Sequence, residues 1–322
     1  MSAVCFYITE NLSKILNQNQ LDAIELACKN TSHVLQKNIP NTEIVTKFNK
    51  SGNEFILCDG VDFLFFVNKA KELITDKLIL MPNEKELGVF EKYKEEMKNI
   101  RFLIGLIHQE ILKAVIIQIL SFKKSKAKNI IQNLSLKSPE TYEQSIEHSS
   151  ERVIIQSKVA DFFSQLIQQK KDKLVAGSAS YAKILSDIVD EFLMNAIWDA
   201  CPARSNIDRT QTVALEENER IELKCLFSDT TLVLSVEDKF GTFKGEGIAK
   251  YIRFGVGYKE TEPIQEGYPG AGLGIFMILQ KIGILIFEVD KGKLTRATVV
   301  ARGDQSIRDV QRKPKTVLFF EK

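Results

Sequence analysis

The chain has 322 residues, of which 44% are hydrophobic and 27% charged, and its formal net charge is +2. This composition is that of an ordinary globular protein, and the length predicts two domains with a connector. The small net charge excludes a strong field that would attract nucleic acid or a membrane surface. The five cysteines show no C-x-x-C spacing, so we expect free thiols in a reducing cytoplasm rather than a zinc site or disulfides.

Targeting and membrane segments are not expected either. The first eight residues lack the basic start and long apolar core of a signal peptide. The most apolar stretch, residues 103–120, is interrupted by five polar or charged side chains. A bilayer span would not readily tolerate them, so we expect a buried helix there.

Residues 1–105 predict a small α/β domain, because short apolar runs alternate with helical patterns. The expected elements are a strand at Ala3–Thr9, a helix at Leu12–Gln36, strands at Glu54–Cys58, Lys77–Met81 and Ile100–Leu106, and a charged helical stretch at Glu84–Lys98.

Acidic residues that follow two of these strands, Glu10 and Asp59, loosely resemble a bacterial receiver domain, in which a carboxylate after the third strand accepts a phosphoryl group. Three departures count against it: no lysine closes the last strand, Pro82 replaces the usual Ser or Thr, and Glu10 has no paired acid. A hairpin from Glu43 to Cys58, turning at Ser51-Gly52-Asn53, is the competing prediction. We expect Asp59 to be a turn residue, with phosphorylation as the alternative.

Residues 106–175 predict a helical connector. One helical pattern covers Leu106–Leu136, Ser138-Pro139 breaks it, and a second covers Ser150–Lys171. The basic cluster Lys123–Lys128 is expected to form a solvated helix face. A connector of this kind is a common place for association, so we expect a protein partner or protein substrate, and a homodimer formed through this region.

The stretch around Asp190–Ile197 predicts an amphipathic helix, with Ser180 as its N-cap. Glu191 and Asn195 lie four residues apart on it, so a carboxylate and an amide project side by side next to a packed face. An exposed helix edge is the alternative interpretation of this pair.

Two further motifs follow in order. The apolar run Val233–Val236 leads into Glu237-Asp238 and then Gly241, which predicts a buried strand that delivers Asp238 to a turn. Gly270, Gly272 and Gly274 form a glycine-rich loop directly before an apolar helix, where backbone N–H groups suit a phosphate. The loop has no P-loop lysine and no preceding strand, so it matches neither the Walker nor the Rossmann fingerprint.

Together these motifs resemble the Bergerat-fold ATP-binding domain shared by gyrase-type ATPases, MutL, the Hsp90 chaperones, histidine kinases and anti-sigma-factor serine kinases. The resemblance covers residues 176–322 and implies a two-layer α/β sandwich that binds ATP and Mg²⁺. It implies the following roles: Asn195 binds Mg²⁺, Glu191 orients or deprotonates the attacking group, Asp238 accepts a hydrogen bond from the adenine amino group, Gly241 gives room for the base, Gly270, Gly272 and Gly274 wrap the phosphates, and Thr298 lies near the adenine, with Thr295 as its competitor. The chain departs from the usual D-x-G-x-G box, because its single glycine, Gly241, is displaced by one residue.

The rest of this region predicts antiparallel strands at Ile221–Phe227 and Thr231–Glu237, and strands at Ile284–Asp290, Leu294–Ala301 and Thr316–Phe320. Residues 243–267 lie where the family keeps its mobile lid, and Lys244, Arg253 and Lys259 are candidates to reach phosphates from it.

None of the histidines His33, His108 and His148 has the sequence context of a phosphoacceptor, and Glu191 is typical of gyrase-like ATPases and anti-sigma serine kinases. We therefore expect a regulatory ATPase or protein serine/threonine kinase of bacterial signal transduction. The alternatives are a non-catalytic, nucleotide-dependent binding switch and an atypical histidine kinase. We expect a cytoplasmic protein that binds neither nucleic acid nor a membrane.

Overall fold

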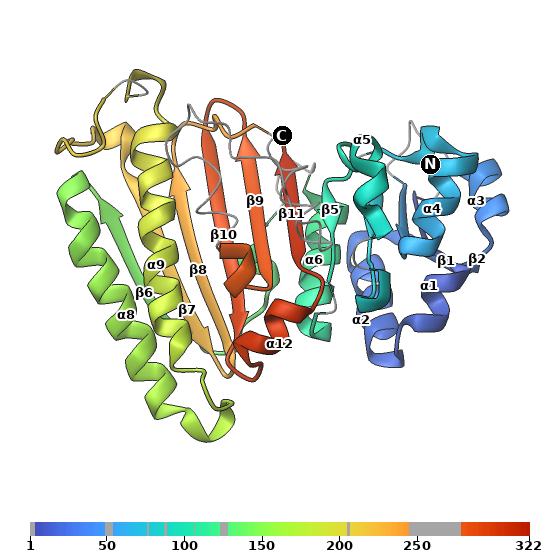
Figure 1. The fold of residues 1–322 in the computed structure, drawn as a ribbon, viewed down its shortest axis with the longest axis horizontal. Helices are drawn as coiled ribbons and strands as arrows, with labels where there is room; N and C mark the ends of the chain where they lie inside the picture. The colour runs from blue at the N-terminus through green and yellow to red at the C-terminus, as the bar shows by residue number, and fades with distance from the viewer. Residues whose placement is uncertain are drawn as a thin grey trace.

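The computed structural model describes residues 4–48, 54–75, 77–86, 89–105, 107–122, 128–204, 207–244 and 278–322. These residues form a mixed α/β protein organised on one 11-stranded sheet, in the order β2-β1-β3-β4-β5-β11-β9-β10-β8-β7-β6. The sheet runs across the whole molecule (Figure 1). The α/β class expected from the sequence is confirmed.

The N-terminal half of the sheet is parallel, and its order β2-β1-β3-β4-β5 is one of the strand orders of doubly wound α/β sheets. Its strands are β1 (Val4–Thr9), β2 (His33–Ile39), β3 (Phe55–Cys58), β4 (Leu78–Leu80) and β5 (Phe102–Leu103). Its helices are α1 (Glu10–Ile15), α2 (Gln18–Thr31), α3 (Asn41–Lys47), α4 (Gly60–Lys69), α5 (Lys94–Met97) and α6 (Gln109–Ser121). Short 3₁₀ turns cover Lys71–Leu73, Glu84–Glu86 and Val89–Tyr93.

Two predictions for this half are wrong. The single helix expected at Leu12–Gln36 is two helices and strand β2, because a capping box at Asn17 starts α2 and Ser32, with a φ of 62°, ends it. The hairpin expected from Glu43 to Cys58 does not form, since Pro40 directly precedes α3 and β3 pairs in parallel with β1 and β4. Its expected turn, Ser51-Gly52-Asn53, lies outside the described residues.

The region expected to be a helical connector contains a strand as well as helices. After α6 come α7 (Ile130–Asn133), β6 (Glu140–Ile146) and α8 (Arg152–Gln169), with a 3₁₀ turn at Ser149–Glu151. Strand β6 pairs antiparallel with β7 and forms the edge of the sheet. The basic cluster expected at Lys123–Lys128 lies outside the described residues except for Lys128.

The C-terminal half is mainly antiparallel, and its strands match the sequence predictions closely. They are β7 (Ile221–Ser228), β8 (Thr231–Asp238), β9 (Ile284–Asp290), β10 (Leu294–Arg302) and β11 (Thr316–Glu321), accompanied by the helices α9 (Ser180–Met194) and α12 (Ile307–Arg312). Further 3₁₀ turns lie at Lys171–Lys173, Pro202–Arg204 and Glu217–Glu219. The predicted β7–β8 and β9–β10 pairs are both antiparallel.

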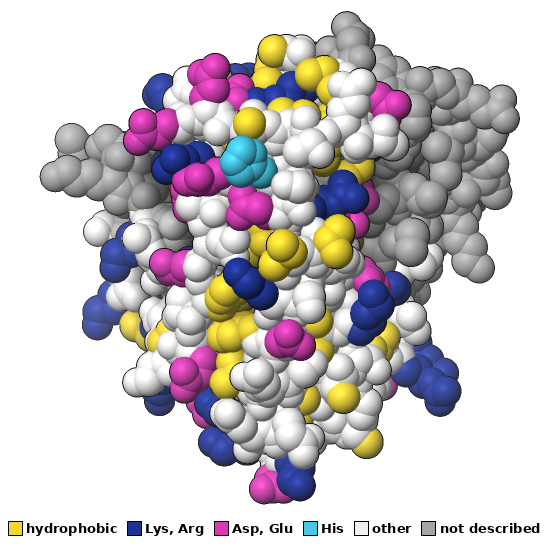
Figure 2. All heavy atoms as spheres, turned by 90° about the vertical axis from the view of Figure 1, so that its left-hand side faces the viewer, with side chains coloured by type: hydrophobic (Ala, Val, Ile, Leu, Met, Phe, Trp, Pro, Cys, Tyr) yellow, Lys and Arg dark blue, Asp and Glu magenta, His cyan; other side chains and the backbone are white. Residues whose placement is uncertain are grey.

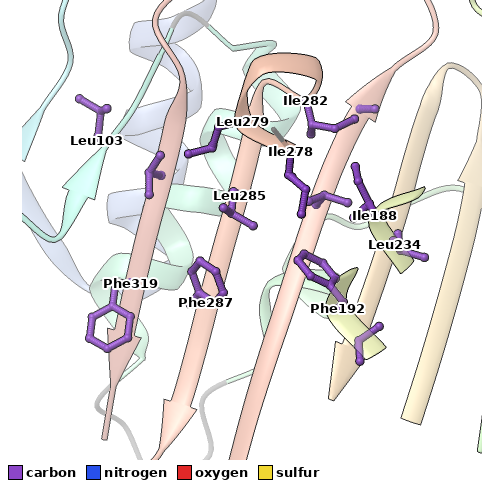
Figure 3. Packing of buried hydrophobic residues seen from close by; sticks show 14 of the residues in the cluster. Leu103, Ile188, Phe192, Leu234, Ile278, Leu279, Ile282, Leu285, Phe287 and Phe319 are labelled. Carbon is purple, nitrogen blue, oxygen red and sulfur yellow. The ribbon is translucent and has the colours of Figure 1, made fainter. Parts of the chain in front are cut away.

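Helices α8 and α9 cover one face of this half, where the larger of two hydrophobic clusters lies (Figure 1). Ile188 and Phe192 of α9 pack over the sheet beside Leu234 and Phe287 (Figure 3). The second cluster lies on the other face, where apolar residues of α2, α6 and α7 cover the strands. This arrangement fixes the position of α9 over β8, β9 and β10.

Strand β11 joins the two halves. It pairs in parallel with β9 and antiparallel with β5, where Val317 lies opposite Leu103. Next to this pair, Gly105 N–H donates to Thr316 Oγ1 at 2.9 Å. A Cβ on Gly105 would lie 2.1 Å from the carbonyl oxygen of Pro314, so only glycine allows the chains to approach this closely.

The outer face at β6 and α8 carries interspersed acidic and basic side chains around a small group of hydrophobic ones (Figure 2). Val153 and Ile154 of α8 are 67% and 58% exposed. The homodimer through this region stays a prediction. Among the described helices, none combines the length and apolarity that crossing a bilayer demands.

Candidate functional site

A cavity of about 300 Å³ lies between the end of α9 and the strands β8, β9 and β10, within the size range of small-molecule sites. The residues that line it are Phe192, Asn195, Ala196, Asp199, Ala200, Val236, Asp238, Thr242, Phe243, Lys244, Phe287, Thr295 and Ala297. The cavity therefore brings together Asn195 and Asp238, two of the residues singled out in the sequence.

Asn195 begins a π-helical turn, Asn195–Asp199, that continues α9. Ala200 N–H donates to the Asn195 carbonyl at 2.8 Å, five residues back instead of four. Turns of this kind insert an extra residue into a helix and often occur at functional sites. At the other end of α9, Ser180 is not the N-cap as expected: Ala179 holds that position, and no side chain caps the helix.

Glu191 and Asn195 interact as their spacing predicts. Asn195 Nδ2 donates to Glu191 Oε1 at 3.3 Å. Because an ionised carboxylate only accepts hydrogen bonds, this contact assigns the amide NH₂ to Glu191 and leaves the Asn195 oxygen for another partner. Burial raises the pKa of Glu191, and the bond from Asn195 and the charge of Arg209 oppose that rise. Glu191 is half-buried and lies behind Asn195, outside the set that lines the cavity.

Asp238 ends β8 and is only 6% exposed. Its Oδ1 accepts hydrogen bonds from Phe240 N–H at 2.9 Å and Gly241 N–H at 3.3 Å, which close the turn after the strand. Burial raises the pKa of Asp238, and the two N–H donors oppose that rise. Opposite it on β10, Thr295 is buried, and its hydroxyl and N–H both lower the pKa of Asp238 by hydrogen bonding. A hydroxyl that donates to a carboxylate can still accept a hydrogen bond from a polar ligand group.

Gly241 shapes the turn after β8. Its φ is +61°, and a Cβ there would lie 2.2 Å from the carbonyl oxygen of Asp290. The glycine therefore lets the turn after β8 pack against the turn between β9 and β10, and Gly241 itself does not line the cavity. Its expected place beside a base stays a prediction.

Thr298 does not line the cavity, whereas its competitor Thr295 does. Successive strand residues point to opposite faces of a sheet, so Thr295 and Ala297 share one face and Thr298 lies on the other. There Thr298 is fully buried and its hydroxyl pairs with Ser235 Oγ at 2.9 Å. The register of β10 thus places Thr295, and not Thr298, on the face of the sheet that lines the cavity.

Two features of the cavity were missed in the sequence. Phe243 stacks face to face on Phe287, with ring centroids 4.4 Å apart and an angle of 12° between the planes, and the two rings form the aromatic wall of the cavity. Asp199 pairs with Arg209 at 2.5 Å, and burial raises the pKa of Asp199 against the effect of that arginine. The sequence could have indicated Asp199, because it lies four residues after Asn195 and so on the same side of a helix. It gave no indication of Phe243, which begins the segment expected to be the lid.

Of the predicted phosphate contacts, Lys244 lines the cavity and is exposed. Gly270, Gly272, Gly274, Arg253 and Lys259 lie outside the described residues. No family model matches the chain, and no curated protein is similar to it in sequence. The cavity and the residues that line it are therefore the basis for the proposed function.

A separate cluster of acids lies in the N-terminal half. Asp59 is 1% exposed and caps α4, because its Oδ1 accepts a hydrogen bond from Asp62 N–H at 2.8 Å. Burial raises the pKa of Asp59 to about 7; the bond from Asp62 N–H opposes this, and the negative charges of Asp62 and Glu86 add to it. Asp59 thus starts a helix directly after β3. Its phosphorylation stays an untested alternative.

Proposed function

We propose that the cavity binds ATP with Mg²⁺ and that the protein is a regulatory ATPase or protein serine/threonine kinase of the anti-sigma-factor type in bacterial signal transduction. One observation carries the proposal: Asn195 and Asp238, from separate motifs of the chain, line the same cavity. The Asn195 amide, beside the Glu191 carboxylate, suits the magnesium and phosphates of a nucleotide. The buried Asp238 carboxylate suits the amino group of its base.

The base end of the site consists of Asp238, Thr295 and the aromatic wall. A carboxylate accepts a hydrogen bond from an amino group, which adenine presents where guanine presents a carbonyl oxygen. The Thr295 hydroxyl, which lines the cavity beside Asp238, offers a second polar contact as an acceptor. Phe243 and Phe287 provide an apolar surface on which a planar base packs, worth about 1 kcal/mol or more beyond its burial.

The cation end consists of Asn195 and Glu191. An amide oxygen is a hard, uncharged ligand that suits Mg²⁺ without adding negative charge beside a triphosphate. When bound, Mg²⁺ would neutralise part of the phosphate charge. Glu191 holds the amide of Asn195 in orientation, and its raised pKa brings the carboxylate closer to the range in which a general base works near neutral pH.

A second candidate is a binding switch without turnover, which closes on ATP and holds a protein partner. The position of Glu191 favours it, since the carboxylate is engaged by Asn195 and does not line the cavity. A pull-down with and without ATP tests for such a partner: a partner retained only with the nucleotide supports the switch.

Calorimetry tests the proposal directly. We expect the wild-type protein to bind Mg-ATP more tightly than Mg-GTP, and Asn195→Ala to abolish Mg-ATP binding because it removes the cation ligand. Asn133→Ala is the matched control, since Asn133 pairs with Gln118 and does not line the cavity. The proposal fails if the wild type binds no ATP at saturating Mg²⁺, or if Asn195→Ala binds as tightly as the wild type.

A further inference from the structure

Arg204 is a buried cation beside the cavity that makes contacts in three directions. It is 6% exposed and ends the 3₁₀ turn Pro202–Arg204, which follows the π-helical turn after two residues, Ala200 and Cys201. Pro202 has no N–H, so the i→i+5 hydrogen bonds of that turn cannot continue to the carbonyl of Ile197. Arg204 Nη1 donates to that carbonyl instead, at 3.2 Å. The guanidinium therefore fixes the segment that begins with Asn195.

The second nitrogen of the guanidinium is equally engaged. Arg204 Nη2 forms an ion pair with Glu219 Oε2, and the two side chains are only 7% and 19% exposed. Glu219 is held in turn by Glu216 N–H at 3.1 Å and lies 3.8 Å from Cys201 Sγ. Moving Arg204 away from Glu219 would leave two buried charges without partners, which is costly. The ion pair therefore holds the guanidinium in place.

The face of the guanidinium lies over Phe240, with its carbon 5.9 Å from the ring centroid. Phe240 belongs to the turn after β8, and its N–H donates to Asp238. Arg204 thus contacts both the segment of Asn195 and the turn of Asp238. A second link runs parallel to it, because Thr242 Oγ1 donates to the Ala200 carbonyl at 2.8 Å.

We infer that Arg204 is a positioning residue that sets the spacing between Asn195 and Asp238, and so between the cation end and the base end of the nucleotide site; this rests on the function proposed above. Arg204 does not line the cavity. Its effect is geometric. A ligand with two ends gains both sets of contacts at once only if the protein presents them at a fixed spacing, since the second contact then forms at a high effective concentration.

The test compares the binding of the whole nucleotide with the binding of its base end and of its phosphate end, each as a separate ligand. Calorimetry measures adenosine, Mg-tripolyphosphate and Mg-ATP binding to the wild type and to Arg204→Lys, which keeps the charge and loses the planar fork. We expect Arg204→Lys to lower the affinity for Mg-ATP about tenfold and to change the affinity for adenosine or Mg-tripolyphosphate less than twofold. Arg302→Lys is the matched control, because Arg302 also pairs with an acidic side chain, that of Asp304, and does not line the cavity. It lies opposite Thr231, at the other end of β8 from Asp238.

The outcomes distinguish a failure of the proposed ATP binding from a failure of the positioning role of Arg204. A wild type that does not bind Mg-ATP overturns the proposed function and this inference with it. A wild type that binds Mg-ATP and an Arg204→Lys variant that binds it within twofold overturn only the inference. Equal losses for all three ligands do the same, because they indicate a general effect on folding. If Arg204→Lys does not fold, Glu219→Gln, which removes the ion pair and keeps the side-chain shape, is judged by the same criteria.

Discussion

Replacing Asp59 by Asn is expected to remove a pH dependence from the stability of the protein. Burial raises the pKa of this carboxyl from 3.8 to about 7. Between these values the folded protein keeps the proton that the unfolded chain has released, so the free energy of unfolding falls as the pH rises. The contribution is complete below pH 4 and lost above pH 7. Asn cannot ionise and is as good an N-cap as Asp, so the variant keeps the start of α4.

The size of the effect follows from the pKa. A rise from 3.8 to about 7 corresponds to about 4 kcal/mol of unfolding free energy, which is an upper limit. Relaxation and water entry reduce the cost of burying a charge, so we expect about 1–3 kcal/mol. At pH 8 the Asp59→Asn variant should be more stable than the wild type by about this amount, and at pH 4 the two proteins should be nearly equal.

Urea denaturation between pH 4 and pH 8 measures this difference, because the change in midpoint at constant slope reports stability. Asp161→Asn is the control, since Asp161 is an exposed residue on α8. The reasoning is refuted if Asp59→Asn unfolds more easily than the wild type at pH 8. It is equally refuted if the difference between the two proteins does not change with pH, because the buried charge would then not be its cause.

Two further substitutions test the site and its frame. Glu191→Gln keeps the side-chain shape and removes the base, so turnover of ATP should fall at least 100-fold while calorimetry shows ATP affinity within threefold. Unchanged turnover would contradict Glu191 as the base, and a wild type that binds ATP without turnover would leave only the binding switch. Gly241→Ala should cost about 3 kcal/mol or more in thermal or urea unfolding, because it combines a positive φ with a clash against Asp290. Gly177→Ala, at φ +90° with open space around it, should cost only about 1 kcal/mol; equal costs would contradict the clash.

The C-terminal strands could be predicted from the sequence because their apolar character is strong. Every residue of Thr231–Val236 is buried, and the turns at both ends of the strand are marked by Asp and Gly. Strand β6 could not be predicted in the same way. It is an edge strand with one covered face, and in Glu140–Ser145 only Tyr142 is strongly apolar. An edge strand needs little apolar surface, and polar residues on it oppose pairing with other chains.

The site was predictable to the level of motifs and not to the level of register. The sequence indicated that Asn195 and Asp238 share a site, and both line the cavity. It could not choose between Thr295 and Thr298, because a shift of one residue in a strand reverses the face on which a side chain lies. Pairing with Asp238 across β8 and β10 makes that choice. The part of Gly241 likewise depends on a turn that is distant in sequence.

The position of β11 explains why a boundary near residue 105 is hard to draw in three dimensions. The last strand of the chain lies between β5 and β9, and its hydrogen bonds extend the N-terminal strands into the C-terminal ones. The rings of Phe102 on β5, Phe122 after α6 and Phe320 on β11 contact one another at centroid distances of 5.2 to 6.2 Å. Without β11, β5 would expose an unpaired edge and lose this aromatic contact. Phe287 lies on β9, the other neighbour of β11, so the strand that covers the N-terminal edge also supports the aromatic wall of the cavity.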